Sequence, residues 1–198
     1  QVSKHNPPPL FIKNFNKSIR FTLHIASITL AIIAIVFLFI KQLFEGNAIS
    51  INTYEIYTKQ PVDFSILGLV DFSNVFIEFS EKNTQVNQII HFTEQNLSAA
   101  KNLKIVAEII MAVGVFVIIS QLFNFRDIAI FASTLISIIL MIILENIAIR
   151  NFVETQLITT HSKDFVAVII LLSISAFLIL LEIIVKYIKI IDENKETK

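Results

Sequence analysis

Four long apolar stretches constrain this chain more than any other feature. They cover Phe21–Ile40, Ile105–Phe123, Ile128–Leu144 and Phe165–Val185. A helix needs roughly 20 largely apolar residues to cross ~30 Å of hydrocarbon. Hydrocarbon offers the backbone no hydrogen-bond partner, so inserted stretches of this kind must be helical. The sequence therefore predicts an all-α membrane protein with a bundle of four transmembrane helices.

Composition supports a membrane location and excludes several classes of chemistry. The mean hydropathy is +0.73, and 55% of the 198 residues are hydrophobic while 16% are charged. The absence of cysteine excludes disulfides and thiolate sites. Sixteen basic residues balance sixteen acidic ones, which gives no reason to expect a nucleic-acid partner. The four histidines are widely separated and glycine is rare, so we expect no metal, cofactor or catalytic site.

Basic residues set the expected topology. Lys and Arg are about twice as dense beside the two termini and the turn near residue 126 as on the opposite side, so both termini are expected in the cytoplasm. The usage of Ile, Phe, Asn and Lys suggests an AT-rich genome and hence a bacterial inner membrane. The expected layout is a cytoplasmic segment 1–20, helices over 21–44, 105–123, 128–146 and 165–186, extracytoplasmic segments 45–104 and 147–164, and a cytoplasmic tail 187–198.

The first apolar stretch is interpreted as a retained anchor rather than a signal peptide. Its length of about 20 residues exceeds the 7–15 residues of a signal h-region. It is followed by Lys41-Gln42-Leu43-Phe44-Glu45, which contains no small-x-small cleavage pattern.

The segment 45–104 is expected to form a small mixed α/β module outside the membrane. Ile49–Thr58 and Phe64–Phe79 are rich in β-branched and aromatic residues, which favours strands, and Pro61 is expected to break the chain between them. A fifth crossing over the second of these stretches is disfavoured because it carries three acidic residues. From Thr84 onward the apolar spacing becomes helical, and this helix is expected to continue into the second span as one rod of about 40 residues.

Two acidic residues lie at the outer ends of the second and third spans. Glu108 is one turn inside the second span, and Glu145 closes the third. Ionisable residues at such depths face the bundle interior or reach toward the interface. They therefore predict either a cation or proton site, with Lys104 or Arg150 as a partner, or two carboxylates that simply reach headgroup water.

A second candidate pair lies near the inner ends of the first and fourth spans. His24 follows Arg20 by one turn, and Glu182 precedes Lys186 by one turn. If these helices are neighbours, His24 and Glu182 lie at matching depth and form a pH-sensitive pair. The alternative is an ordinary i,i+4 pair between Glu182 and Lys186, with His24 marking the interface.

Four segments at the ends of the spans form a recognisable layout: Phe39-Ile40-Lys41-Gln42-Leu43, Ile105-Val106-Ala107-Glu108, Phe125-Arg126-Asp127 and Ile142-Ile143-Leu144-Glu145-Asn146. In this layout the chain resembles the phosphate-starvation-inducible family of small four-helix bacterial membrane proteins. The resemblance implies a bundle of four helices, in which a polar network built on the family's groups would be incomplete. This chain departs from the family in its longer first loop, in Asn146 where the family has histidine, and in Gln121 near a family glutamate. The family's own role is unsettled, so the resemblance implies no reaction.

Three functions follow from these observations. The first is a non-enzymatic accessory or stress-response subunit that contacts the lipid bilayer and either a protein partner or further copies of itself. The alternative is a small oligomeric ion or solute transporter or channel that uses Glu108 and Glu145. The third is a pH sensor centred on His24 and Glu182.

Overall fold

The computed structural model describes residues 10–51, 57–82, 94–123 and 127–196. Four of its helices are long and apolar enough to cross a membrane, over Lys17–Ile40, Gln95–Leu122, Asp127–Phe152 and Lys163–Tyr187. This confirms the predicted four-helix membrane architecture. In chain order the elements are α1 (Leu10–Ile40), β1 (Phe44–Ile51), β2 (Tyr57–Phe64), α2 (Ile66–Lys82), α4 (Glu94–Leu122), α5 (Asp127–Phe152), β3 (Ile158–His161) and α6 (Lys163–Glu196).

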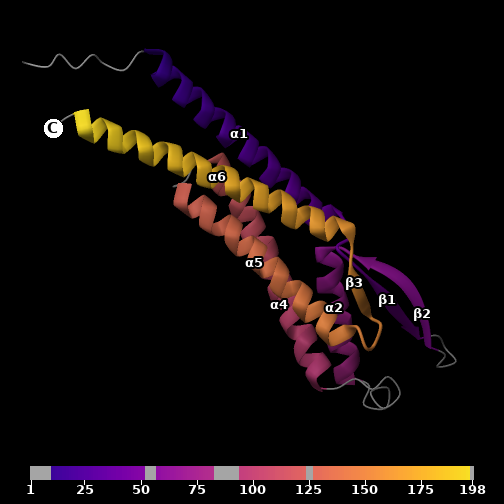
Figure 1. Ribbon diagram of the computed structural model, residues 1–198. Helices are drawn as coiled ribbons and strands as arrows, with labels where there is room; N and C mark the ends of the chain where they lie inside the picture. The colour runs from indigo at the N-terminus through magenta and orange to yellow at the C-terminus, as the bar shows by residue number, and fades with distance from the viewer. Residues whose placement is uncertain (1–9, 52–56, 83–93, 124–126, 197–198) are drawn as a thin grey trace, which may run out of the picture.

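The four long helices form a closed ring in the order α1, α6, α5, α4. The first helix packs most extensively along the last, and α4 packs along α5; α5 also contacts α6, and α4 contacts α1. Figure 1 shows the start of α1 and the end of α6 together at one end of the bundle, here called the termini end. Helices far apart in the sequence therefore share the largest interface.

Buried positions on the long helices recur at alternating steps of three and four residues. On α4 the buried stripe includes Ala100, Leu103, Ala107, Ile110, Gly114, Val117 and Gln121. This is the heptad spacing of left-handed helix bundles, in which one narrow stripe of each helix faces its neighbours. No more than 33% of the most apolar window of any span is buried. The remaining apolar surface, for example at Ile105 and Ile170, faces outward where lipid would lie.

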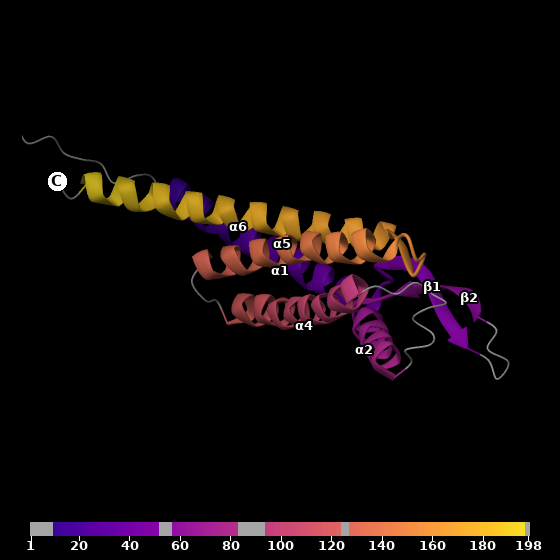
Figure 2. The ribbon, with the colours of Figure 1, turned by 90° about the horizontal axis from the view of Figure 1, so that it is seen from below.

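A small sheet and the helix α2 lie at the opposite end of the bundle, here called the cap end (Figures 1 and 2). The sheet has the order β2-β1-β3, and β1 is antiparallel to both neighbours. The strand β3 belongs to the connection between α5 and α6. We call β1, β2, β3 and α2 the cap. The cap confirms the predicted mixed α/β segment and adds a strand from the later loop.

The predicted strand over Phe64–Phe79 is wrong, because most of this stretch forms α2. Pro61 does not separate two strands but lies inside β2, opposite Asn47. The sheet order makes β2 an edge strand, where a residue without an N–H is tolerated. The predicted helix start at Thr84 lies outside the described residues, whereas the predicted continuity into the second span is confirmed for α4 from Glu94 onward.

The predicted strand over Ile49–Thr58 lies only partly within the described residues. Its first part ends β1, and its last two residues begin β2. The first helix ends at Ile40, before the predicted boundary at residue 44, because Phe44 already begins β1.

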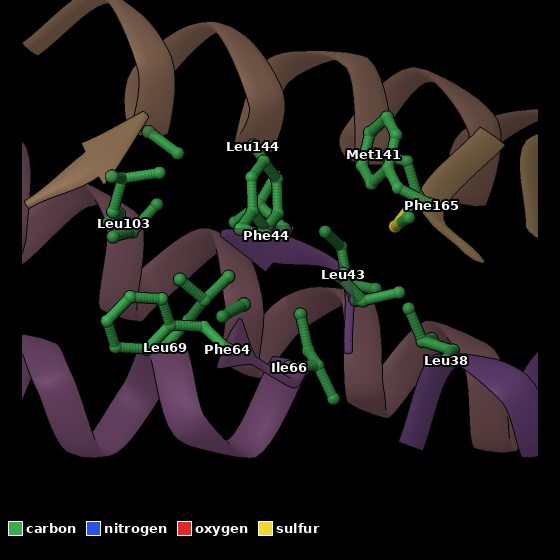
Figure 3. Close-up of a cluster of buried hydrophobic side chains, with 14 of the residues drawn as sticks. Leu38, Leu43, Phe44, Phe64, Ile66, Leu69, Leu103, Met141, Leu144 and Phe165 are labelled. Atoms are coloured by element: carbon green, nitrogen blue, oxygen red, sulfur yellow. The ribbon is translucent and has the colours of Figure 1, made fainter. Parts of the chain in front are cut away.

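The cap and the cap end of the bundle share one hydrophobic core. Figure 3 shows side chains from the cap, among them Phe44, Phe64, Ile66 and Leu69, meeting side chains from the long helices. The Phe44 and Phe165 rings lie 5.2 Å apart between centroids. The cap therefore packs directly against the bundle through this core and is not connected to it by the chain alone.

Phe152 at the end of α5 joins the same core from the side of α2. Its ring lies 5.4 Å from Phe72 and 5.6 Å from Phe76, both edge to face. Aromatic pairs of this geometry add to the stabilisation that comes from burying their surface. Phe152 therefore packs the end of α5 against α2.

Candidate functional site

Buried polar side chains on the long helices lie mainly between the middle of the bundle and the termini end. Those in this region are Ser27 on α1, Ser120 and Gln121 on α4, Ser133, Thr134 and Ser137 on α5, and Ser175 and Glu182 on α6, whereas Asn96 on α4 is buried at the cap end. Most of the hydroxyls bond a carbonyl of their own helix, as Ser133 and Thr134 both do with Ile130. The bundle interior is thus more polar toward the termini end than toward the cap.

The most polar part of this region joins α1 to α6 through Glu182. The Glu182 side chain is only 10% exposed. His24 Nδ1 lies 3.2 Å from Glu182 Oε2, and an Arg20 guanidinium nitrogen lies 3.9 Å from Glu182 Oε1. Arg20 and His24 are four residues apart, so both project from one face of α1 toward the carboxylate. The structure therefore brings together the pair predicted from matching depth.

A second contact joins the same two helices nearer the middle of the bundle. The Ser175 hydroxyl donates to the Ser27 carbonyl oxygen at 3.0 Å, and both side chains are buried. The Ser27 hydroxyl itself donates to the carbonyl of His24. We call the five residues Arg20, His24, Ser27, Ser175 and Glu182 the α1–α6 clasp.

Lys186 does not pair with Glu182 as the alternative interpretation expected. Its ammonium group donates to Asp127 Oδ2 at 2.6 Å, which joins α6 to the start of α5. Asp127 lies in the first turn of α5, where a negative charge is favourable. The Glu182 carboxylate therefore has Arg20 and His24 of α1 as its neighbours.

The chemistry of the clasp depends on its histidine. An ionised carboxylate only accepts hydrogen bonds, so beside one the His24 nitrogen at 3.2 Å is the donor. A neutral imidazole makes a hydrogen bond to it, and a protonated one makes an ion pair. Histidine is the side chain that ordinarily changes charge between pH 5 and 8. The clasp therefore links α1 and α6 through a contact between a histidine and a carboxylate.

The two outer carboxylates have separate partners. Glu108 is half exposed and lies 3.9 Å from Lys104 on its own helix, the partner that the sequence suggested. Glu145 Oε1 lies 2.6 Å from His161 Nδ1 on β3. That distance is short enough for an ion pair, but the angle is not that of a hydrogen bond, since His161 Nδ1 has no hydrogen-bond partner among the described residues. Glu108 thus lies near a lysine of its own helix, and Glu145 lies near a histidine of β3.

Sequence reasoning missed several polar contacts at the cap end. Asn96 donates to the Asn151 carbonyl at 2.7 Å, which joins α4 to α5. Asn47 donates to the Gln156 carbonyl at 2.6 Å and holds β1 to the connection after α5. Asparagine within or beside an apolar stretch was the available signal, but its partner depends on the tertiary fold. Within the described ranges, no three His, Asp or Glu side chains are grouped as a metal site.

Comparison with protein-family models, with curated proteins and with solved structures finds no match for this chain. The resemblance to the phosphate-starvation-inducible family therefore stays a prediction.

Proposed function

We propose that the protein is a non-enzymatic multi-pass membrane protein that acts as an accessory or stress-response subunit. The observation that supports this proposal best is the continuous core of the cap and the cap end of the bundle. A cap fixed to the membrane helices presents its outer surface in one orientation. Such a rigid surface suits a subunit that docks onto a partner protein in the same membrane.

The same core argues against a transport path through a single copy. Leu38, Leu43, Phe44 and Phe165 are each no more than 1% exposed where a solute would have to pass. Glu108 and Glu145 also have separate partners rather than a shared site. Transport would therefore require an interface between copies. Proteoliposome flux that is lost in Glu108→Gln would support that alternative, whereas unchanged flux would contradict the proposed role of Glu108.

A second candidate function is pH sensing through the α1–α6 clasp. The contact between His24 and Glu182 favours it, because a pH-dependent attraction between the first and last helices would alter the shape of the termini end. In an accessory subunit, this change would reach the partner through the helix ends on that side.

Native mass spectrometry of the full-length protein, extracted gently from its own membrane, tests the main proposal. A second protein at fixed stoichiometry is the expected result. A monomer or homo-oligomer without a partner would contradict it. Repeating the extraction at pH 5.5 and pH 8.0 tests the second candidate, which predicts a pH-dependent partner yield that disappears in His24→Gln.

A further inference from the structure

A groove lies on the lipid-facing side of α5, near its cap end. It has a volume of about 410 Å³, and its apolar part is lined by Ile142, Ile143 and Ile147. The first two of these side chains are 51% and 41% exposed, so they are open to the surroundings of the bundle. A hydrocarbon chain would find a complementary surface there.

The other part of the groove is polar. Its lining includes Asn146, Arg150 and Asn151 on α5, and Gln95 near the start of α4. Asn151 uses its amide nitrogen to bond the Ile147 carbonyl. Arg150 is exposed and makes no ion pair with any residue that the structure describes. The groove thus contains an uncompensated guanidinium group beside exposed amides.

The order of these residues along α5 matches the depth profile of a membrane. Arg150 lies in the last turn of a helix that ends at Phe152, which places it at the level of the headgroups. Ile142 lies eight residues earlier, about 12 Å deeper in the hydrocarbon at 1.5 Å per residue. The cationic end of the groove is therefore at the interface and its apolar end is within the bilayer.

We propose that this groove binds a glycerophospholipid, with the phosphate on Arg150 and an acyl chain along the isoleucines. A guanidinium group fits a phosphate better than other cations do, because its planar fork donates two parallel hydrogen bonds. The amides of Asn146 and Gln95 supply further donors to the phosphate and glycerol oxygens. A structural role for Arg150 alone, as a cation near a helix C-terminus, would need neither the groove nor the second helix.

The test uses the full-length protein in detergent, delipidated and then mixed with micelles that contain phosphatidylglycerol. Native mass spectrometry measures the bound lipid for the wild type, for Arg150→Gln and for the control Lys163→Gln. The control removes the same charge from an exposed residue at the cap end that does not line the groove. We expect the affinity to fall at least about tenfold in Arg150→Gln and to stay unchanged in the control.

Two further probes separate the sources of binding. Diacylglycerol with the same acyl chains lacks the phosphate and is expected to bind weakly, and inorganic phosphate alone is expected not to bind. Equal binding of diacylglycerol, or binding of inorganic phosphate without lipid, would overturn the proposal. Asn146→Leu replaces an exposed amide with an apolar side chain, so it keeps the test valid if Arg150→Gln fails to fold. Unchanged phosphatidylglycerol binding in Asn146→Leu and in any folded Arg150→Gln would also overturn it.

Discussion

Two serines on α6 make the same kind of hydrogen bond to different helices. Ser175 donates across the interface to Ser27 at 3.0 Å, whereas Ser173 donates to Ile169 of its own helix at 2.7 Å and is exposed. Interhelical hydrogen bonds in membrane proteins contribute about 0.6 kcal/mol. We expect Ser175→Ala to lower the free energy of unfolding in mixed micelles by about that amount, and Ser173→Ala to leave it nearly unchanged. Equal losses of unfolding free energy in the two variants would contradict a stabilising contact between Ser175 and Ser27.

The clasp also predicts a pH-dependent stability. An imidazolium attracts a carboxylate more strongly than a neutral imidazole does, so the proposed pH-sensing role predicts the larger contribution at low pH. Arg20 faces the same carboxylate but keeps its charge throughout this range. We expect His24→Gln to lower the thermal midpoint more at pH 5.5 than at pH 8.0. The comparison is made in a His161→Gln background, which removes the histidine contact with Glu145. A pH-independent difference would contradict the prediction.

The two candidate pairs show what residue positions alone can predict. His24 and Glu182 could be matched because depth in a membrane follows directly from the distance to the helix end. The contact itself also requires α1 and α6 to be neighbours, and the residue pattern of the two segments does not predict which helices pack together. The partner of Glu145 could not be found in this way. His161 reaches it from β3, whose place depends on pairing with β1.

Among the elements, the contact between β1 and the connection before β3 leaves no room for a side chain. A Cβ at Gly46 would lie 2.0 Å from the Leu157 carbonyl oxygen, a backbone atom that cannot move alone. At Gly68 in α2 the nearest atom would be at 3.5 Å, which is an ordinary contact. We expect Gly46→Ala to cost at least about 1–3 kcal/mol and Gly68→Ala to be neutral or stabilising.

Thermal unfolding of these two variants in detergent measures the difference. A Gly46→Ala protein as stable as the wild type would mean that β1 does not approach the connection this closely. The control shares the same substitution and the same region of the chain, so a general loss from added bulk would appear in both.

The helix α2 shows how a strand prediction can fail. Val75, Ile77 and Phe79 would lie on one face of a strand, with Asn74, Glu78 and Ser80 on the other, which is typical of a strand. Over a longer window the buried residues are Ile66, Leu69, Ser73 and Phe76, at helical steps of three and four. Ser65 caps this helix by accepting from the Gly68 N–H at 3.1 Å. The helical signal was therefore present, but the aromatic and β-branched content concealed it.

Across the whole molecule, the shared core predicts that the cap and bundle unfold together. Phe152 is fully buried between α2 and the long helices, whereas Phe177 is 58% exposed on the lipid-facing side. Phe152→Ala is expected to cost about 3–5 kcal/mol. Far-UV circular dichroism and near-UV signals should then change in one transition at a lower temperature. Phe177→Ala should have little effect. Separate transitions for the cap and the helices would contradict a common core.

The orientation of the molecule is a further prediction, since only the density of Lys and Arg supports it. The chain contains no cysteine, so single cysteines can be introduced without interference. Thr160→Cys on the exposed part of β3 is expected to react with a membrane-impermeant maleimide in intact cells. Lys198→Cys is expected to react only after the cells are permeabilised. The reverse labelling pattern would show that the termini lie outside the cytoplasm.

The large interface between α1 and α6 has a consequence for synthesis of the chain. Ser27 and Ser175 are separated by 148 residues, which a ribosome adds in roughly 7–30 s at about 5–20 residues per second. Throughout that interval Arg20 and His24 are in the membrane without the carboxylate that later accompanies them. An insertase or a membrane chaperone would therefore encounter the first helix before its contacts with the last helix exist. The clasp can therefore form only after the last helix has been synthesised.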